Sequence, residues 1–309
     1  MAKQVIGVLL MAYGAAGSLE EVAPYLADIR AGRPPSPELV EEVKHRYQLM
    51  GGRSPLLDIT KQQAAALEVC LNKNKEGGPF KVYIGMRHWH PYIKDTVTSM
   101  AKDGIRKMVG LCLTPYYSRM SVGAYFKKLE DAQTGLNITC EVIRVESWND
   151  HPLLIEAITQ KVQKALEGFD RTVRKDAAIL FSAHSLPSRI LEEKDPYPQE
   201  LNETIQAVMK KVGSYHWWFA YQSQGRTPEP WLGPDVGEVI NRLHQEGCRH
   251  LLMAPIGFIS DHMETLYDVD IMYRKQAESL GMQLQRAESL NATSTFIEAM
   301  ASVVRAHLS

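Results

Sequence analysis

The chain has 309 residues, enough for about two domains of average size. Its 35 basic and 36 acidic side chains give a formal net charge of −1, so the excess of positive charge typical of a nucleic-acid-binding protein is missing. Apolar residues make up 45% of the chain and charged residues 23%, as in an ordinary globular protein. The composition therefore predicts a large buried core and excludes nucleic acid from the expected partners.

Four cysteines lie far apart in the sequence, at Cys70, Cys112, Cys140 and Cys248. Because no two of them form a C-x-x-C pair, the sequence predicts neither a structural zinc site nor a disulfide framework. The apolar run 5–12 has the length of a signal-peptide core, but it ends in the turn-like Tyr13-Gly14, and we interpret it as a first buried strand. No later segment approaches the roughly 20 apolar residues of a membrane span. We expect a cytoplasmic protein, and peripheral membrane contact stays open.

Short apolar runs alternate with amphipathic segments along the chain. The apolar runs predict strands at 5–12, 80–85, 108–113, 140–145, 177–182, 217–221, 251–256 and 283–287. The amphipathic segments predict helices at 59–72, 92–103, 122–132, 153–166, 197–212, 236–245 and 296–307. This alternation is typical of parallel sheets that are covered by helices on both faces.

Similar segments in the two halves of the chain indicate an internal duplication. The segment 104–107 (Gly-Ile-Arg-Lys) precedes an apolar run, as does 247–250 (Gly-Cys-Arg-His), and the strand end at 8–14 parallels that at 179–185. The polar stretch 167–176 is the best candidate for a boundary between the halves. We therefore predict an α/β fold with two similar domains, residues 1–166 and 176–309.

Ligands of such folds bind at the carboxyl ends of the parallel strands. The residues expected at these ends form a polar set rich in histidine and tyrosine: Tyr13, His88, Tyr116, His184, Gln222 and Asp261 to Glu264. Neither G-x-G-x-x-G after the first strand nor G-x-x-x-x-G-K-[ST] occurs, which argues against a dinucleotide enzyme and a P-loop ATPase.

His184 follows an apolar strand that changes abruptly into small polar residues and a proline. A histidine in this position can bind a metal ion or transfer a proton near neutral pH. The alternative is a structural imidazole whose nitrogens are satisfied by the backbone. The residue pattern alone leaves both interpretations open.

A second cluster of functional groups surrounds Glu264. Asp261 and Glu264 resemble a helix capping box, which is a structural role. Glu264 and Asp268, however, are four residues apart and would share a helix face, where two like charges repel unless a cation is near. This spacing indicates a path for a metal ion. A regular helix would place Met272 on the same face, so the acidic stripe is expected to stop there.

A donor-rich segment near the N-terminus contains Arg30, Arg33, Arg46, Tyr47 and Ser54. Scattered arginines most often lie on a solvated loop or helix. The functional alternative is a carboxylate-binding segment, because a guanidinium binds carboxylates in bidentate geometry.

The sequence resembles the ferrochelatases, enzymes that insert ferrous iron into a porphyrin at the end of haem synthesis. Six motifs carry the resemblance: 11–14 (MAYG), 51–56 (GGRSPL), 181–187 (FSAHSLP), 195–198 (DPYP), 231–234 (WLGP) and 261–267 (DHMETLY). They occur in family order over nearly the whole chain. The resemblance implies two Rossmann-like domains, each a parallel sheet flanked by helices, with porphyrin between them.

The resemblance also implies roles for individual residues. His184 and Glu264 correspond to the facing pair at the macrocycle centre, which either binds iron or accepts the pyrrole protons. Asp268 is not part of this correspondence, and its spacing from Glu264 alone predicts that it supplies or releases metal ions. Tyr13 corresponds to the position on the opposite face. The expected contacts to the propionates and the pocket are Arg30, Arg46, Tyr47, Ser54, His88, Tyr125 and Trp231. The sequence departs from the bacterial family pattern at two positions. Ala31 replaces a second arginine, which weakens the expected binding of substrate carboxylates, and Met272 replaces an acidic residue, which weakens the case for an outer metal site.

The resemblance implies that Fe²⁺ is a substrate and that no organic cofactor is needed. It implies no iron–sulfur cluster, because the extra cysteines of the relatives that carry one do not occur here, and it favours a monomer. The short polar segment between residues 11 and 54 favours coproporphyrin III as the substrate, whereas the segment 286–291 resembles the protoporphyrin IX type. Alternatives are a cobalt or nickel chelatase of a reduced tetrapyrrole and a porphyrin or haem carrier without catalysis.

Overall fold

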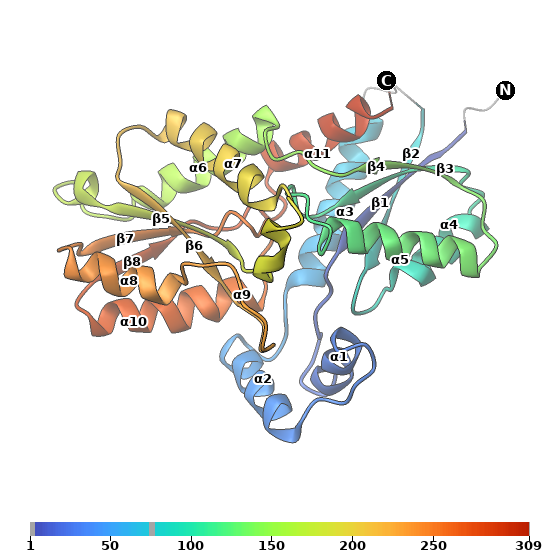
Figure 1. The fold of residues 1–309 in the computed structure, drawn as a ribbon. Coiled ribbons are helices and arrows are strands. Elements are labelled where there is room, and N and C mark those ends of the chain that lie inside the picture. Colours follow the sequence, from blue (N-terminus) through green and yellow to red (C-terminus); the bar gives the residue numbers. More distant parts are fainter. Residues whose placement is uncertain (1–3, 74–77, 309) are drawn as a thin grey trace. The chain divides into compact units, whose positions relative to one another are not determined.

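The computed structural model describes residues 4–73 and 78–308, and it contains two four-stranded parallel sheets (Figure 1). The first sheet has the order β2-β1-β3-β4 and the second the order β6-β5-β7-β8. The strands are β1 (Ile6–Ala12), β2 (Phe80–Met86), β3 (Lys107–Cys112), β4 (Glu141–Val145), β5 (Ala178–His184), β6 (Trp217–Gln222), β7 (His250–Ala254) and β8 (Gln283–Arg286). All eight strands lie where the apolar runs predict them, and the α/β fold with two similar parallel sheets is confirmed.

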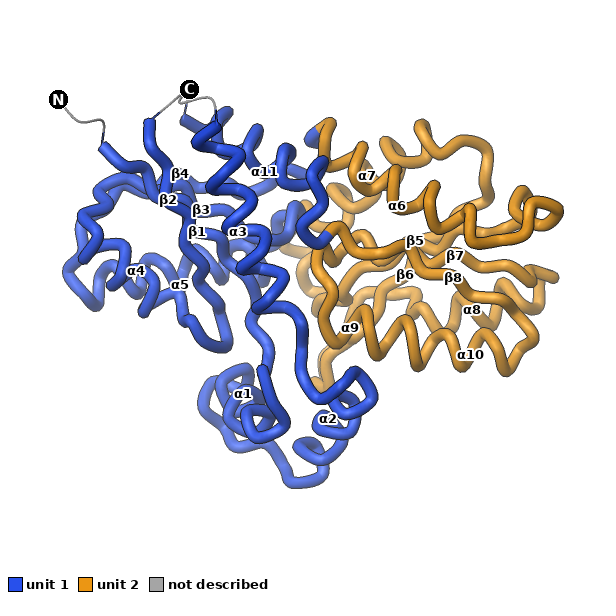
Figure 2. The backbone as a smooth tube through the Cα atoms, turned by 180° about the vertical axis from the view of Figure 1, so that it is seen from behind, with its two compact units in different colours: residues 1–151, 291–309 blue, residues 152–290 orange. Residues whose placement is uncertain are grey.

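The chain divides into two compact units, Met1–His151 with Asn291–Ser309, and Pro152–Leu290 (Figure 2). The sequence-based division into 1–166 and 176–309 follows the two sheets, and the compact units differ from it by one helix at each side. Helix α6 (Pro152–Leu166) belongs to the second unit because it packs against α7 and the strands β7 and β8. Helix α11 (Ser294–Ala306) belongs to the first unit because it packs against α3.

In the first unit, β1 is one of the two inner strands and is almost completely buried. Its helices are α1 (Val22–Ile29), α2 (Pro37–Leu49), α3 (Leu56–Asn72), α4 (Ile93–Lys102), α5 (Val122–Gly135) and α11. The sequence did not predict α1 and α2, which are short and carry few buried residues. A start signal for α2 is nevertheless visible, because the Ser36 hydroxyl accepts a hydrogen bond from Leu39 N and Pro37 opens the helix.

In the second unit, β5 is the corresponding inner strand, and its residues are buried up to His184. The helical segments are α6, α7 (Tyr197–Val212), α8 (Val236–Gln245), α9 (Met263–Leu266) and α10 (Arg274–Ser279), with short 3₁₀ turns at Arg174–Asp176 and Ser188–Leu191. No helix within the described residues is long and apolar enough to cross a membrane.

The helix after Glu264 is not regular, which corrects the expectation of a continuous α-helix through Met272. Residues Asp268–Tyr273 form a π-helix, in which the Met272 N–H donates to the Tyr267 carbonyl five residues earlier. Asp268 is buried, whereas Met272 is 40% exposed. The two positions therefore differ in environment.

Candidate active site

In the second unit, the end of β5 holds His184 in one orientation. Its Nδ1 contacts the carbonyl of Ser185, and its own carbonyl accepts a hydrogen bond from the Tyr197 hydroxyl at 2.9 Å. Because a carbonyl oxygen can only accept, the Nδ1 of His184 carries the ring proton. Nε2 is therefore the nitrogen that can take up a proton or bind a metal ion.

Glu264 lies in the first turn of α9, with its carboxylate facing two imidazoles. Its Oε1 is 3.6 Å from Nε2 of His184, and its Oε2 is 3.9 Å from Nε2 of His262. Both distances exceed a hydrogen bond, and Oε2 is buried without a hydrogen-bond partner among the described residues. The backbone of Glu264 is fixed by Gln222, whose Nε2 donates to the Glu264 carbonyl at 2.8 Å. This carboxylate can accept a proton or a cation without first breaking a hydrogen bond of its own.

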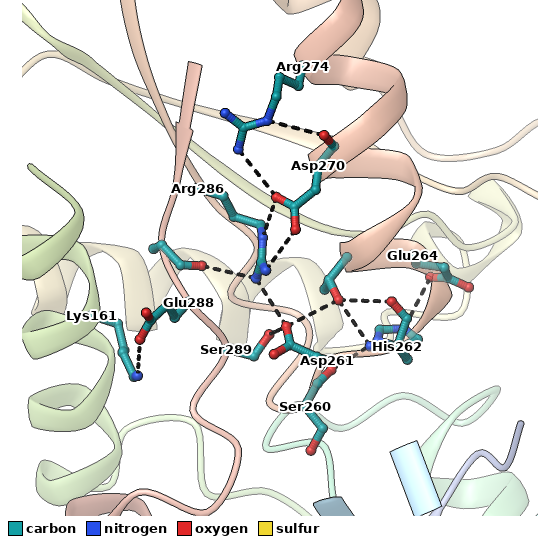
Figure 3. A network of polar contacts seen from close by, with 12 residues as sticks. Lys161, Ser260, Asp261, His262, Glu264, Asp270, Arg274, Arg286, Glu288 and Ser289 are labelled. Carbon is teal, nitrogen blue, oxygen red and sulfur yellow. Dashed lines mark hydrogen bonds and ion pairs between the residues drawn. The ribbon is translucent and has the colours of Figure 1, made fainter. Parts of the chain in front are cut away.

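His262, which the sequence places in the strand-end set 261–264 without a role of its own, also faces the Glu264 carboxylate. Its Nδ1 lies 3.0 Å from the Ser260 carbonyl, so this ring also directs Nε2 toward Glu264. Phe258 lies against the His262 ring at a centroid distance of 4.8 Å and near the His184 ring at 6.5 Å. The available signal was the position of His262 inside the motif 261–267, two residues before Glu264. Figure 3 shows His262 and Glu264 side by side.

Asp268 is buried and accepts a hydrogen bond from the Ser223 hydroxyl at 2.7 Å. Within residues 4–73 and 78–308, no group of three His, Cys, Asp or Glu side chains forms a metal-binding cluster. The expected role of Asp268 as a metal ligand stays a prediction.

Trp231 is half-buried in the second unit and held by its own loop. Its Nε1 donates to the Thr227 hydroxyl at 3.0 Å, and its backbone bridges to Pro187, three residues after His184. A Cβ at Gly225 would lie 2.4 Å from the Trp231 ring, so the indole rests directly on the backbone of that loop. This packing fixes the position of the ring.

In the first unit, Tyr13 and His88 follow the carboxyl ends of β1 and β2 as predicted. Tyr13 is 42% exposed, and its ring lies 4.7 Å from that of His88. His88 is buried, and its Nδ1 is 2.8 Å from Oδ1 of Asp28 on α1. Burial, together with the charge of Arg87, lowers the pKa of His88 to about 4, although the Asp28 carboxylate acts in the opposite direction. Near neutral pH this ring is uncharged and donates from Nδ1 to Asp28.

Three of the other predicted contact residues of the first unit carry hydroxyl groups and lie in its interior. Tyr47, Ser54 and Tyr125 are buried: the Tyr47 hydroxyl accepts from Ala16 N at 3.3 Å, and Ser54 Oγ accepts from Leu56 N at 3.3 Å. Burial raises the pKa of Tyr47 to about 12 and that of Tyr125 above its usual range, so both phenols stay protonated.

The arginines of this segment differ from each other. Arg30 follows the last residue of α1 and is exposed. Arg46, on α2, forms an ion pair with Glu42 at 2.6 Å one helical turn earlier. The exposed guanidinium of Arg30 is accessible to a ligand carboxylate. At Arg46, a ligand carboxylate would have to replace Glu42.

The chain is similar to known proteins over nearly its whole length. The sequence matches the ferrochelatase family profile over residues 5–308. It is 41% identical over 297 residues to the ferrochelatase of Herpetosiphon aurantiacus, covering 96% of this chain and 97% of the relative. It is 40% identical over 307 residues to the coproporphyrin III ferrochelatase of Geobacillus sp. (strain WCH70), covering 98% of each. A solved sirohydrochlorin chelatase from Bacillus subtilis subspecies spizizenii shares the fold, with a TM-score of 0.57 and 10% identity over 99% of this chain and 95% of that one.

We expect His88→Gln to reduce the loss of stability in acid. Because the pKa of His88 is lower in the folded chain than the ordinary 6.5, the unfolded chain binds the proton first as the pH falls. The contribution of the neutral His88 ring to the free energy of unfolding is complete above pH 6.5 and is lost as the pH falls toward 4. Between pH 7 and pH 5 the wild-type chain therefore loses about 2 kcal/mol of this free energy. Urea unfolding at these two pH values measures it, with His45→Gln on the exposed side of α2 as the control. An equal acid loss in wild type and His88→Gln would contradict the prediction.

We expect Gly257→Ala to displace His184. A Cβ at Gly257 would lie 2.7 Å from the Cα of Ala183 and 3.4 Å from the backbone N of His184, so the end of β5 must move. Overpacking of this kind costs about 1–3 kcal/mol. Thermal unfolding and a crystal structure of the variant measure the cost and the distance between His184 and Glu264. Gly135→Ala, at a position with no atom within 4 Å, is the matched control. A variant with wild-type stability and an unmoved His184 would refute this prediction.

Proposed function

Because the chain belongs to the ferrochelatase family, whose members insert iron into a porphyrin, we propose that His184 and Glu264 carry out this reaction here. The observation that supports these roles is the Glu264 carboxylate, which faces the Nε2 atoms of His184 and His262 without a hydrogen bond to either. Metal insertion must strip water from Fe²⁺ and remove two protons from pyrrole nitrogens. A base with an adjacent acceptor supplies the second requirement.

In this proposal the Nε2 atom of His184 takes up a pyrrole proton. Because Nδ1 carries the ring proton, Nε2 has the free lone pair that a proton acceptor needs. The Glu264 carboxylate at 3.6 Å then stabilises the imidazolium by its charge, and it can pass the proton on to His262. The same donor atoms would bind Fe²⁺ in the alternative role, and the two roles differ in whether added iron restores an impaired variant.

We assign substrate binding to the first unit. The exposed guanidinium of Arg30 is suited to bind a propionate, with Arg46 as a second cation once Glu42 is displaced. Tyr47, Ser54 and Tyr125 are the proposed hydroxyl contacts, and Tyr13 and His88 contribute rings at the strand ends. Trp231 of the second unit is the proposed contact to the cavity wall.

We favour coproporphyrin III, with four propionates, over protoporphyrin IX, with two. The segment 11–54 forms two short helices whose exposed residues are mainly polar, which suits a substrate rich in carboxylates. The similarity to relatives named coproporphyrin III ferrochelatase over nearly the full length supports this choice.

Fe²⁺ is a substrate of the reaction. We propose that catalysis uses no organic cofactor and no iron–sulfur cluster, since the chain has only four well-separated cysteines. We also propose a monomer in the cytoplasm, without assigning a membrane contact. A carrier that only binds porphyrin would have no turnover to lose in His184→Ala, which distinguishes it from the enzyme.

We expect Glu264→Gln to abolish iron insertion at every iron concentration. Gln has the shape of Glu but cannot accept a proton at neutral pH. Asp268→Asn is the matched variant: it should weaken insertion most at low iron, and added Fe²⁺ should partly restore the rate. Anaerobic Fe²⁺ titrations of both variants measure this difference. Rescue of Glu264→Gln by iron, or an inactive Asp268→Asn at saturating iron, would reverse the assigned roles.

We expect kcat/KM to be higher for coproporphyrin III than for protoporphyrin IX.

We expect Arg30→Ala to raise KM for the tetracarboxylate porphyrin with a smaller change in kcat, because a contact remote from the reacting atoms binds ground state and transition state alike. The loss is about 1.5–3 kcal/mol if the contact is desolvated. Steady-state rates on both porphyrins decide the point, and a preference for protoporphyrin IX would overturn the substrate assignment.

A further inference from the structure

One buried arginine connects the two ends of the segment that carries Glu264. Arg286 is the last residue of β8, and its side chain is 11% exposed. Its Nε and Nη2 donate to the two carboxylate oxygens of Asp270 at 2.8 and 2.9 Å, and its Nη1 donates to Oδ1 of Asp261 at 3.1 Å. Figure 3 shows the guanidinium between these two carboxylates.

The two carboxylates lie on either side of the functional residues in the sequence. Asp261 immediately precedes His262, and Asp270 lies in the π-helix two residues after Asp268. The segment between them includes His262, Glu264 and Asp268. Its first part has little regular structure, since α9 consists of four residues, Met263–Leu266. Contacts at its ends must therefore hold it in place.

The first of these end contacts is a small network centred on Asp261. Besides Arg286, the Oδ1 of Asp261 accepts a hydrogen bond from the Ser289 hydroxyl at 2.8 Å. Thr265 on α9 lies close as well, with its hydroxyl 3.5 Å from the same oxygen. The Arg286 guanidinium thus fixes the Asp261 carboxylate, and Asp261 in turn holds the start of the segment 261–270 in place.

We propose that Arg286 is a positioning residue for iron insertion, which holds the segment 261–270 so that Glu264 faces His184 and His262. The inference rests on the proposed function, and it adds a residue that touches none of the reacting groups. Hydrogen bonds that hold the neighbours of a reactive side chain also orient that side chain, and their loss commonly lowers activity by about 10- to 100-fold.

Arg274 offers a matched control in the same network. Its Nε donates to the Asp270 carbonyl at 3.1 Å and its Nη1 to the Leu284 carbonyl at 2.9 Å, so it ties the π-helix to β8 as Arg286 does. Its ion pairs within the described chain involve Asp270 but not Asp261. A variant at Arg274 therefore loosens the far end of the segment and leaves the Asp261 contact intact.

The test compares Arg286→Gln, Arg286→Lys and Arg274→Gln in anaerobic steady-state iron insertion. We expect Arg286→Gln to lower kcat at least about tenfold, with KM for porphyrin and iron within about twofold of wild type. Lys keeps the positive charge but cannot donate to both carboxylates as the guanidinium does. The kcat of Arg286→Lys should therefore lie between those of wild type and Arg286→Gln. Arg274→Gln should keep a kcat near that of wild type. A wild-type kcat in Arg286→Gln, or an equal loss in both Gln variants, would overturn the proposal.

If Arg286→Gln does not fold, Ser289→Ala tests whether the contacts of Asp261 support kcat. It removes one hydrogen bond from Asp261, and we expect kcat to fall about threefold at constant KM. A wild-type kcat in Ser289→Ala would then refute the role of the Asp261 anchor.

Hydrogen exchange separates failure of this inference from failure of the proposed function. We expect the amides of residues 261–267 to exchange faster in Arg286→Gln, whereas Arg274→Gln should affect only residues 268–280. This readout needs no substrate. If wild type inserts iron into no porphyrin, the proposed function fails, and the exchange pattern alone tests whether Arg286 holds the segment. Unchanged exchange at 261–267 would show that it does not.

Discussion

Two backbone carbonyls orient the imidazoles that face the Glu264 carboxylate. Ser185 O contacts Nδ1 of His184, and Ser260 O contacts Nδ1 of His262, so both rings direct Nε2 toward Glu264. A buried carboxylate oxygen without a hydrogen bond costs free energy. A proton or a cation at this point would remove that cost, and this observation supports the role proposed for Glu264.

The surrounding fold supplies the rigidity that this arrangement needs. His184 ends a strand buried on both faces, and Gly257 approaches the backbone of that strand so closely that a methyl group does not fit. On the other side, Gln222 fixes the Glu264 backbone, and Arg286 ties both ends of the segment to β8. Reactive side chains on short, irregular elements are thus held by contacts from a rigid sheet.

The sequence predicts the sheets and the strand-end residues well because both depend on local patterns. Eight short runs predict eight strands, and the ends of the two buried runs that form β1 and β5 locate Tyr13 and His184 directly. The sequence predicts the surroundings of Glu264 poorly, because no residue pattern distinguishes the π-helix from an α-helix and the Arg286 contacts join residues 16 and 25 positions apart. The orientation of His262 could not be predicted for a related reason: it is set by the Ser260 carbonyl, which no spacing rule indicates.

The two units contain a histidine at or just after a strand end, yet these histidines are held in different ways. His88 donates to Asp28 at hydrogen-bonding distance, is buried, and has a pKa of about 4, so its charge state does not change near neutral pH. His184 stays more exposed and lies 3.6 Å from its carboxylate, too far for a hydrogen bond. Closing that gap becomes favourable only when a proton or a cation joins the pair. The two parallel sheets thus hold one imidazole that is hydrogen-bonded to its carboxylate and one whose carboxylate lies beyond hydrogen-bonding distance, and the proposed role of proton acceptor falls on the second.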